Sequence, residues 1–357
     1  GHAGRARALA PRPAAAPDRP DARRPLVAEG TWYTVDHPSA VGSVRRGAST
    51  AARNLGLDDE RAAEVGLVVS ELATNQCRHA GGGSVLVRVR RTGAEAALDV
   101  LAVDAGPGMR DITAAMRDGV SSRGTLGIGL GTLPRLASAW DAWTSPGQGT
   151  VIAATFVAHG ATADLAAPTG VTRPMTGQDV CGDALAVRHD DGAPSLLVAD
   201  GLGHGPLPAG AAGAAVRACL AAPPGSAGAL LERVHGALGG TRGAAVSVVQ
   251  ASGGVLRHAG LGNIAGTVHG ARSRGLVSHP GIAGTRGRPL RETTYPVEPG
   301  DVVVLHSDGL TARWSLADYP GLAVRSPLVV AGVLLRDHAV RRDDSCVAVL
   351  PIPREAA

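Results

Sequence analysis

Two hydrophobic patterns divide the chain. Up to residue 158, segments in which apolar positions have helical spacing alternate with short apolar runs. The elements predicted in this part are helices at 40–55, 58–80 and 131–139 and strands at 85–91, 96–104 and 149–157. Their order predicts helices packed on one face of a mixed sheet.

After residue 177 short apolar runs dominate, and few segments have helical spacing. We predict strands at 184–188, 195–198, 244–250, 254–259, 302–306 and 345–350 and helices at 208–221, 229–238 and 327–337. Many strands with a few long helices predict an α+β sandwich with sheets inside and helices outside.

Composition indicates where the domains end. Residues 1–28 are mostly Ala, Pro and Arg without periodicity, which predicts a disordered tail. Residues 159–176 are rich in Gly, Ala, Pro and Thr, which predicts a linker. Two domains of ordinary size remain, at 29–158 and 177–353.

The net charge is +4, and all 35 basic residues are arginines. These arginines are spread out and aromatic residues make up 2% of the chain, which argues against nucleic-acid binding. No signal peptide and no run of 18 apolar residues is present, so we expect neither secretion nor membrane contact. The four cysteines form no metal or redox motif. We therefore expect a cytoplasmic protein.

One group of motifs predicts an ATP site. Glu71 and Asn75 lie four residues apart, on one face of a predicted helix. Asp104 follows a predicted strand, and glycine-rich segments at 106–108 and 124–131 come next, the second leading into a predicted helix. Asparagine can coordinate Mg²⁺ between nucleotide phosphates, while a strand-end aspartate can bind an adenine amino group. Glycines and a helix N-terminus suit phosphates.

These motifs are similar to those of the GHKL ATPase superfamily, in its branch of small switch-protein kinases and anti-sigma factors, over about residues 26–158. SELATNQCRHAGGG resembles the N-box, VDAGPGM and GTLGIGLGTLPRLAS resemble the two glycine boxes, and GQGTVIAATF resembles the closing strand. The resemblance implies an α/β sandwich that binds ATP and Mg²⁺. The subtype resembled is the RsbT switch kinase, whose family phosphorylates a serine on a small STAS-domain partner.

The same resemblance implies a role for individual residues. Asn75 would be the Mg²⁺ ligand, Glu71 the general base and Asp104 the adenine anchor. The implied nucleotide contacts are the glycines of the two glycine boxes, namely Gly106, Gly108, Gly127, Gly129 and Gly131.

A second group of motifs predicts a metal site. Asp183, Asp200, Asp308 and Asp343 each lie beside a glycine or at the end of a predicted strand. Carboxylates at such positions are costly unless paired or metal-bound, and four together repel one another without cations. Oxygen ligands favour Mg²⁺ or Mn²⁺, and two such ions can activate a bridging water for attack on phosphorus. The alternative is ordinary Asp-Gly turn chemistry.

These motifs resemble the metal-dependent protein phosphatases (the PPM superfamily), in their SpoIIE-like and RsbX-like branch, over about residues 176–353. GD, ADGLGHG, GNI, SDGL and DDS follow the order of the family's motifs. The resemblance implies an αββα sandwich that holds two Mn²⁺ or Mg²⁺ ions, with Asp200 catalytic. The implied metal ligands are the four aspartates and one backbone carbonyl, namely Asp183, Asp200, Gly201, Asp308 and Asp343.

Other positions near these motifs are less specific. Asp344 fits a position that the family fills with Asp or Asn. We expect His204 to cap or pack at a helix start, and Asn263 has no assigned role. The segment 241–243 is either a simple turn or lies beside the active site. No arginine near the start of this domain matches the phosphate-binding arginine of eukaryotic relatives.

The two resemblances together predict a bifunctional signalling regulator in a stress or sigma-factor pathway. The C-terminal domain would be a Ser/Thr phosphatase acting on a phosphorylated STAS-domain antagonist or scaffold protein. The N-terminal domain would be a serine kinase for such a partner, or would bind a sigma-factor regulator. The alternative is a nucleotide-dependent anti-sigma-type binding protein without kinase turnover.

Overall fold

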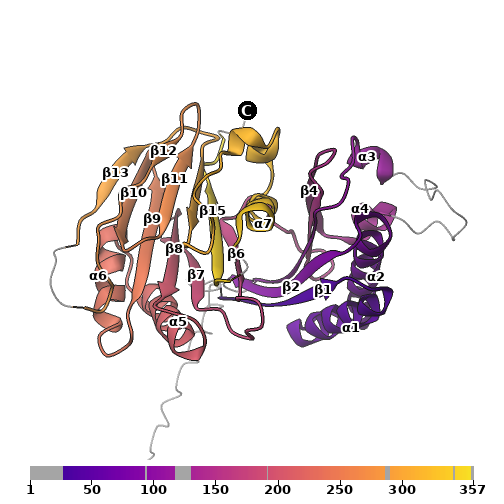
Figure 1. The fold of residues 1–357 in the computed structure, drawn as a ribbon, viewed down its shortest axis with the longest axis horizontal. Helices are drawn as coiled ribbons and strands as arrows, with labels where there is room; N and C mark the ends of the chain where they lie inside the picture. The colour runs from indigo at the N-terminus through magenta and orange to yellow at the C-terminus, as the bar shows by residue number, and fades with distance from the viewer. Residues whose placement is uncertain are drawn as a thin grey trace, which may run out of the picture.

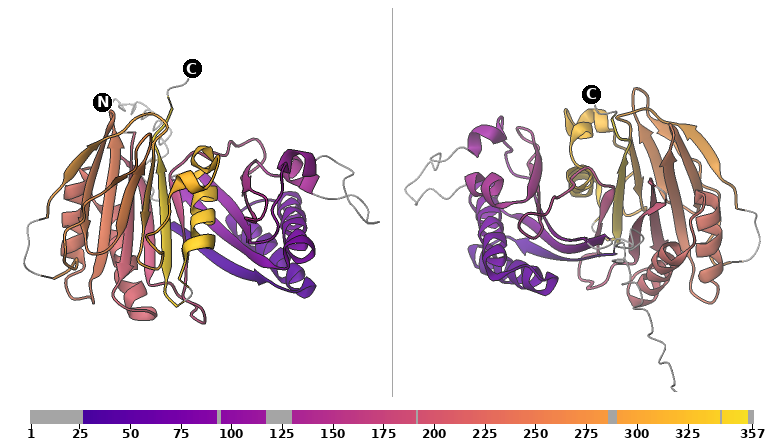
Figure 2. Two further views of the ribbon diagram at one scale, coloured as in Figure 1. Left: turned by 45° about the horizontal axis from the view of Figure 1, so that its top comes forward. Right: turned by 180° about the vertical axis from the view of Figure 1, so that it is seen from behind.

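The computed structural model describes residues 27–92, 95–116, 130–190, 192–285, 290–340 and 342–354. They form two domains that lie side by side (Figures 1 and 2). Among the described residues, no helix is long and apolar enough to cross a membrane.

The N-terminal domain is a five-stranded antiparallel sheet with helices on one face (Figure 1). Its strands have the spatial order β1-β2-β3-β5-β4. They are β1 (Val27–Val35), β2 (Gly83–Thr92), β3 (Glu95–Asp104), β4 (Ala139–Thr144) and β5 (Thr150–Phe156). The helical elements are α1 (Pro38–Leu55), α2 (Asp59–Asn75), a π-turn at Gln76–Ala80, α3 (Ile112–Ala115), a 3₁₀ turn at Leu130–Thr132 and α4 (Leu133–Leu136).

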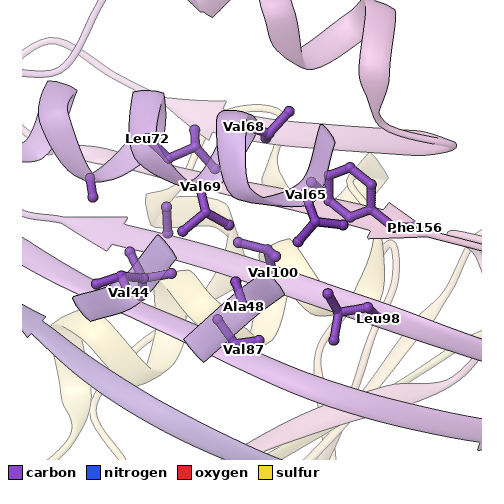
Figure 3. Packing of buried hydrophobic residues seen from close by; sticks show 14 of the residues in the cluster. Val44, Ala48, Val65, Val68, Val69, Leu72, Val87, Leu98, Val100 and Phe156 are labelled. Atoms are coloured by element: carbon purple, nitrogen blue, oxygen red, sulfur yellow. The ribbon is translucent and has the colours of Figure 1, made fainter. Parts of the chain in front are cut away.

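Helix α2 begins and packs as its sequence predicts. The Asp58 side chain accepts a hydrogen bond from Arg61 N, and Asp59 and Glu60 in the first turn suit the positive end of the helix dipole. Figure 3 shows its apolar side facing the sheet, where it meets α1 and strand residues. The buried contacts include Val44, Ala48, Val65, Val69, Val87, Leu98, Val100 and Phe156.

The C-terminal domain contains two five-stranded antiparallel sheets. The first has the order β13-β10-β9-β8-β7 and consists of β7 (Asp183–Asp190), β8 (Ala193–Gly201), β9 (Ala244–Ser252), β10 (Val255–Leu261) and β13 (Thr293–Pro296). The second has the order β12-β11-β14-β15-β6 and consists of β6 (Thr169–Arg173), β11 (Ala265–His269), β12 (Arg274–Gly275), β14 (Val302–His306) and β15 (Ser345–Pro351).

Helices cover the outer faces of these two sheets, as expected for an αββα sandwich (Figure 1). Helices α5 (Pro206–Ala221) and α6 (Ala227–Ala237) pack on the first sheet through an Ala- and Leu-rich layer. Helix α7 (Pro327–His338) lies on the second. Two short 3₁₀ turns, at Leu316–Asp318 and Leu322–Val324, precede α7.

Helix α7 belongs to the cores of both domains. Val329, Val330 and Val333 are buried in one cluster with Leu101 and Val151 of the N-terminal sheet. The same cluster contains residues of β6, β14 and β15 in the C-terminal domain. The helix therefore fills the space between the outer face of the N-terminal sheet and the second C-terminal sheet.

Polar contacts add to this apolar boundary. Asp99 and Arg88 form a buried ion pair with an N–O distance of 3.1 Å, and Arg90 also pairs with Asp99. The Arg88 guanidinium continues across the boundary to Thr169 Oγ1, at 2.7 Å, and to the Gly170 carbonyl. Burial alone would raise the pKa of Asp99, but the two arginines outweigh it and the pKa falls below its usual value.

The N-terminal sheet is antiparallel, so the expectation of a mixed sheet was wrong. Strand β4 was not predicted from the sequence. Without β4, the strands β3 and β5 would be joined by a helix alone, and such a connection between neighbouring strands implies that they are parallel. The helix expected at 131–139 is only a 3₁₀ turn and the single turn α4, because Ala139 already pairs in β4.

Two segments expected to be irregular contain strands. Within the predicted linker, 169–173 forms β6, which pairs with β15 and buries Val171. At the end of the predicted tail, β1 begins at Val27 and pairs with β2. Both strands lie at an edge of their sheets. An edge strand pairs on one side only, so it can form from a sequence with a weak alternation of apolar and polar residues.

Candidate nucleotide and carboxylate sites

The end of α2 carries the first two candidate residues. Glu71 and Asn75 lie one turn apart, and Asn75 is the last residue of the helix. Burial raises the pKa of Glu71, against a smaller opposing effect of Arg78, which brings the carboxyl closer to the range of a general base. The Asn75 side-chain nitrogen is buried and has no hydrogen-bond partner among the described residues. Such an orphan amide fits a ligand site, because unpartnered buried polar atoms are costly.

Gln76 connects this helix end to the sheet. Its Nε2 donates to the carbonyls of Ser84 and Val103, both at 3.1 Å. These bonds hold the π-turn at Gln76–Ala80 beside the end of β3. The sequence analysis did not single out this residue, although a polar side chain within the N-box is a signal for such a role.

Asp104 lies at the end of β3, as predicted. Its Oδ1 accepts hydrogen bonds from Gly106 N at 2.9 Å and Thr150 N at 3.2 Å. Burial raises its pKa, although these bonds and nearby Arg336 oppose the rise. The carboxylate therefore has a fixed orientation, and its remaining acceptor capacity can receive a donor such as an exocyclic amine.

The glycines after Asp104 are required by close backbone contacts. A β-carbon on Gly106 would lie 2.5 Å from Ala80 Cβ. Gly108 has φ +66°, and a β-carbon there would lie 2.0 Å from Ser145 O. Gly131 lies in the 3₁₀ turn and is buried. Gly127 and Gly129 lie outside the described residues.

The second candidate site starts with two facing aspartates. Asp183 begins β7 and Asp200 ends β8, and the two are directly opposed across the strand pair. Burial, against the hydrogen bond from Ser307, raises the pKa of Asp183 to about 7. Burial and the neighbouring carboxylates raise that of Asp200 to about 8. Like charges held this close disfavour ionisation unless a cation neutralises them.

Asp308 and Asp343 come to the same end of the sandwich. Both carboxylates contribute to the raised pKa of Asp200. Asn263 Nδ2 donates to Asp308 Oδ2 at 2.7 Å, which gives this asparagine a definite positioning contact. The absence of a side chain at Gly309 lets the Asp308 segment lie close to the Asp344 segment, because a β-carbon at Gly309 would lie 1.8 Å from the Asp344 carbonyl oxygen. The structure thus brings the four predicted aspartates together.

Two further polar residues hold the aspartates in place. Ser307, which is fully buried, donates to Asp183 Oδ2 at 2.6 Å and accepts from Cys346 N at 2.9 Å. Asp344 accepts from Met175 N and Gly182 N, both at 2.8 Å. Its two oxygens therefore fix the segment that leads into Asp183. The sequence analysis missed Ser307, although its place directly before Asp308 in SDGL is a usable signal.

Loops around the aspartates contain the remaining candidates. Gly201 ends β8 and allows α5 to approach, since a β-carbon would lie 2.3 Å from Pro208 O. His204 is exposed and opposes the rise that burial causes in the pKa of Asp343, while Gly205 is the residue that precedes α5. The expectation that His204 caps or packs at the helix start was therefore wrong.

The segment 241–243 lies beside the Asp200 loop, which favours the second of its two interpretations. Leu202 N donates to Gly243 O at 3.4 Å. The Arg242 Nη1 lies 3.6 Å from the position of a β-carbon on Gly203. The chain thus places an exposed guanidinium beside Gly203, three residues after Asp200.

The aspartates are close without forming a finished coordination shell. In the described part of the chain, no three His, Cys, Asp or Glu side chains are arranged to hold a metal ion as they stand. The donor set nevertheless fits hard cations, because the four predicted ligand side chains supply carboxylate oxygens. To bind a metal ion, the aspartate side chains would have to change rotamer while the backbone stays fixed.

Comparison with known proteins defines the class of the N-terminal domain. The family model of the histidine kinase-like ATPase domain matches residues 35–156, which span β1 to β5. The serine/threonine-protein kinase RsbT of Bacillus subtilis (strain 168) is 33% identical over 114 residues, which are 32% of this chain and 86% of that protein. Through this domain, the chain belongs to the RsbT-like family of histidine kinase-like ATPases.

Several solved structures are similar to the C-terminal half. A chain of "The bacterial stressosome: a modular system that has been adapted to control secondary messenger signaling" has TM-score 0.47 and 28% identity, covering 51% of this chain and 97% of that one. The structure of RsbX in complex with magnesium has TM-score 0.42 and 22% identity, covering 50% of this chain and 92% of that one. The Mycobacterium tuberculosis serine/threonine phosphatase PstP/Ppp has TM-score 0.39 and 16% identity, covering 51% and 97%.

Proposed function

We propose that the C-terminal domain is a metal-dependent phosphatase for phosphoserine or phosphothreonine in a partner protein. The observation that carries this proposal is the convergence of four aspartates from separate segments, of which buried Asp183 and half-buried Asp200 are directly opposed. Asp183, Asp200, Asp308 and Asp343, with the Gly201 carbonyl, would hold two Mg²⁺ or Mn²⁺ ions. Such ions supply an activated water and neutralise the phosphoryl oxygens.

The chain's own residues would prepare this site. Ser307 and Asn263 orient two of the aspartates, and Asp344 fixes the backbone before Asp183. Arg242 would bind a phosphoryl oxygen, because a guanidinium matches that geometry. The raised pKa values of Asp183 and Asp200 mean that cations compete with protons here, so cation binding should strengthen as the pH rises.

Removal of divalent cations tests this proposal directly. The full chain with Mn²⁺ should hydrolyse p-nitrophenyl phosphate, and EDTA should reduce the rate to background. Restoring Mn²⁺ in excess should restore activity, which separates metal loss from unfolding. Turnover that persists in EDTA would contradict the metal assignment, and the absence of turnover with every divalent ion would contradict the phosphatase itself.

We further propose that the N-terminal domain binds ATP with Mg²⁺ and phosphorylates a serine of a STAS-domain partner in a stress or sigma-factor pathway. The orphan amide of Asn75, the raised pKa of Glu71 and the fixed orientation of Asp104 support it. Similarity to the serine/threonine-protein kinase RsbT supports the reaction class, and the type of partner is the one that the resemblance of the motifs implies. The competing proposal is an anti-sigma-type protein that binds ATP without transferring phosphate.

Substitution of Glu71 separates these two proposals. Glu71→Ala should lower phosphotransfer from ATP to a purified STAS-domain protein by about 100-fold or more, the usual contribution of a general base. ATP affinity should change little, since the role assigned to Glu71 is towards the nucleophile. Asp59→Asn is the matched control, because that acid is 92% exposed at the other end of α2. ATP binding without any transfer by the wild type would favour the binding protein.

A further inference from the structure

Exposed apolar side chains gather on the loops that carry the aspartates. Of the seven large apolar side chains that are exposed in the described part of the chain, three lie on these loops and a fourth, Leu207, lies in the first turn of α5, directly after one of them. We call them the apolar rim, and their exposed fractions are 40% for Val180, 38% for Leu202, 66% for Leu207 and 40% for Val340. Val180 precedes Asp183 by three residues, and Val340 precedes Asp343 by three.

The loops of the apolar rim adjoin one another. A β-carbon on Gly182 would lie 3.3 Å from Gly203 O and 3.3 Å from Pro208 Cβ, so the loop of Val180 contacts the loop between Leu202 and Leu207. On the other side of the site, Val340 N donates to Gly309 O at 2.7 Å. The four side chains therefore lie on three separate segments, each of which adjoins an aspartate of the site.

Charge near the rim indicates what kind of molecule it suits. Arg242 is exposed beside Gly203 and has no ion pair or hydrogen bond among the described residues. One free guanidinium can bind one phosphoryl group, whereas a strongly acidic peptide would need a row of cations. A small phosphate ester needs no apolar border. Exposed apolar groups around a site are typical of protein–protein contact.

We propose that the apolar rim and Arg242 select a phosphoprotein segment in which apolar side chains flank the phosphorylated serine or threonine. Arg242 binds the phosphate while the rim buries the flanking side chains. This inference rests on the proposed phosphatase function and adds the substrate class to it. It places the selectivity in loops at the mouth of the site, separate from the residues that would hold metal.

A comparison of three substrates tests the rim with the full chain and Mn²⁺. They are p-nitrophenyl phosphate, a phosphoserine peptide with leucine and valine flanks, and a peptide of equal charge with serine and asparagine flanks. The double variant Val180→Ser, Leu207→Ser should lower kcat/KM for the apolar peptide about tenfold or more, as removal of buried apolar anchors does at interfaces. Its kcat/KM for the other two substrates should stay within about twofold.

Val324→Ser is the matched control. Val324 is 61% exposed and precedes α7, whose other end adjoins the site, about 18 Å away along the helix. It should leave all three rates unchanged. If the double variant cleaves both peptides like the wild type, the rim proposal is wrong while the phosphatase stands. If the wild type cleaves none of the substrates, the phosphatase proposal fails and the rim proposal fails with it.

Discussion

Replacement of Asp200 by asparagine is expected to lower kcat/KM for phosphate-ester hydrolysis by about a thousandfold or more. The carboxylate lies opposite Asp183 and near the other two aspartates, where it would be one of the cation ligands. The asparagine amide carries no negative charge to balance the cations. The affinity of the site for the cations and the water that they would activate are therefore lost together. A loss of about 4 kcal/mol of transition-state stabilisation corresponds to this factor, and metal ions commonly supply several kcal/mol.

Two measurements make this outcome specific. Titration of Mn²⁺ by calorimetry should show weaker binding to Asp200→Asn, while its urea unfolding midpoint should not fall, because removal of a repelled carboxylate relieves repulsion. Glu298→Gln is the control, since this exposed acid lies before β14, at the end opposite Asp308. Full activity of Asp200→Asn at saturating Mn²⁺ would overturn the assignment of this residue.

Asp99→Ala is expected to destabilise the protein by about 3–5 kcal/mol, because it leaves the buried Arg88 charge without its partner. The aspartate is 2% exposed and Arg88 is 3% exposed, so water cannot replace the lost carboxylate. Arg88 also donates to Thr169 and Gly170, and its displacement should therefore loosen the boundary between the domains. Urea denaturation at pH 7 measures the effect.

Thr155→Val is the matched control for Asp99. It removes one hydrogen bond to Asp99, of 2.9 Å, and should cost about 1 kcal/mol. Because the pKa of Asp99 is depressed, its stabilisation is fully present above its unfolded value near about 4 and is lost as the pH falls through the lower folded value. The difference between wild type and Asp99→Ala should therefore shrink in acid. A constant difference down to the lowest pH that permits folding would contradict the ion-pair explanation.

Local sequence patterns predicted most of the secondary structure. They also predicted that the aspartate motifs, which are far apart in the sequence, lie close together in the fold. Each of the motifs that contain Asp183, Asp200 and Asp308 combines an apolar run with an Asp beside glycine, so strand ends and tight turns follow from the sequence. The strands that were missed are β1, β4, β6, β11, β12 and β13, and all of them except β1 have six residues or fewer. The pairing of β1 and β6 depends on strands far along the chain, which hydrophobic periodicity does not report.

Parts of the candidate sites depend on tertiary contacts that no local pattern encodes. Arg242 approaches the Asp200 loop only because β8 and β9 pair in a particular register, with Gly201 opposite Ala244. The second carboxylate of DDS had no assigned role in the sequence, yet Asp344 accepts hydrogen bonds from backbone N–H groups of a segment about 160–170 residues away. His204 looked like a helix cap, but its loop directs it to the surface.

The double packing of α7 limits how the molecule can be dissected. An N-terminal half cut after residue 158 would expose Leu101, Val151 and Trp143 to water, since α7 covers them in the intact chain. The Trp143 indole would also lose the Pro320 carbonyl, to which it donates at 3.1 Å. A C-terminal half alone would carry the bare side of α7. Separately expressed halves would thus be poor surrogates for the intact protein, and recombination that exchanged one half would have to supply a matching apolar surface on the other.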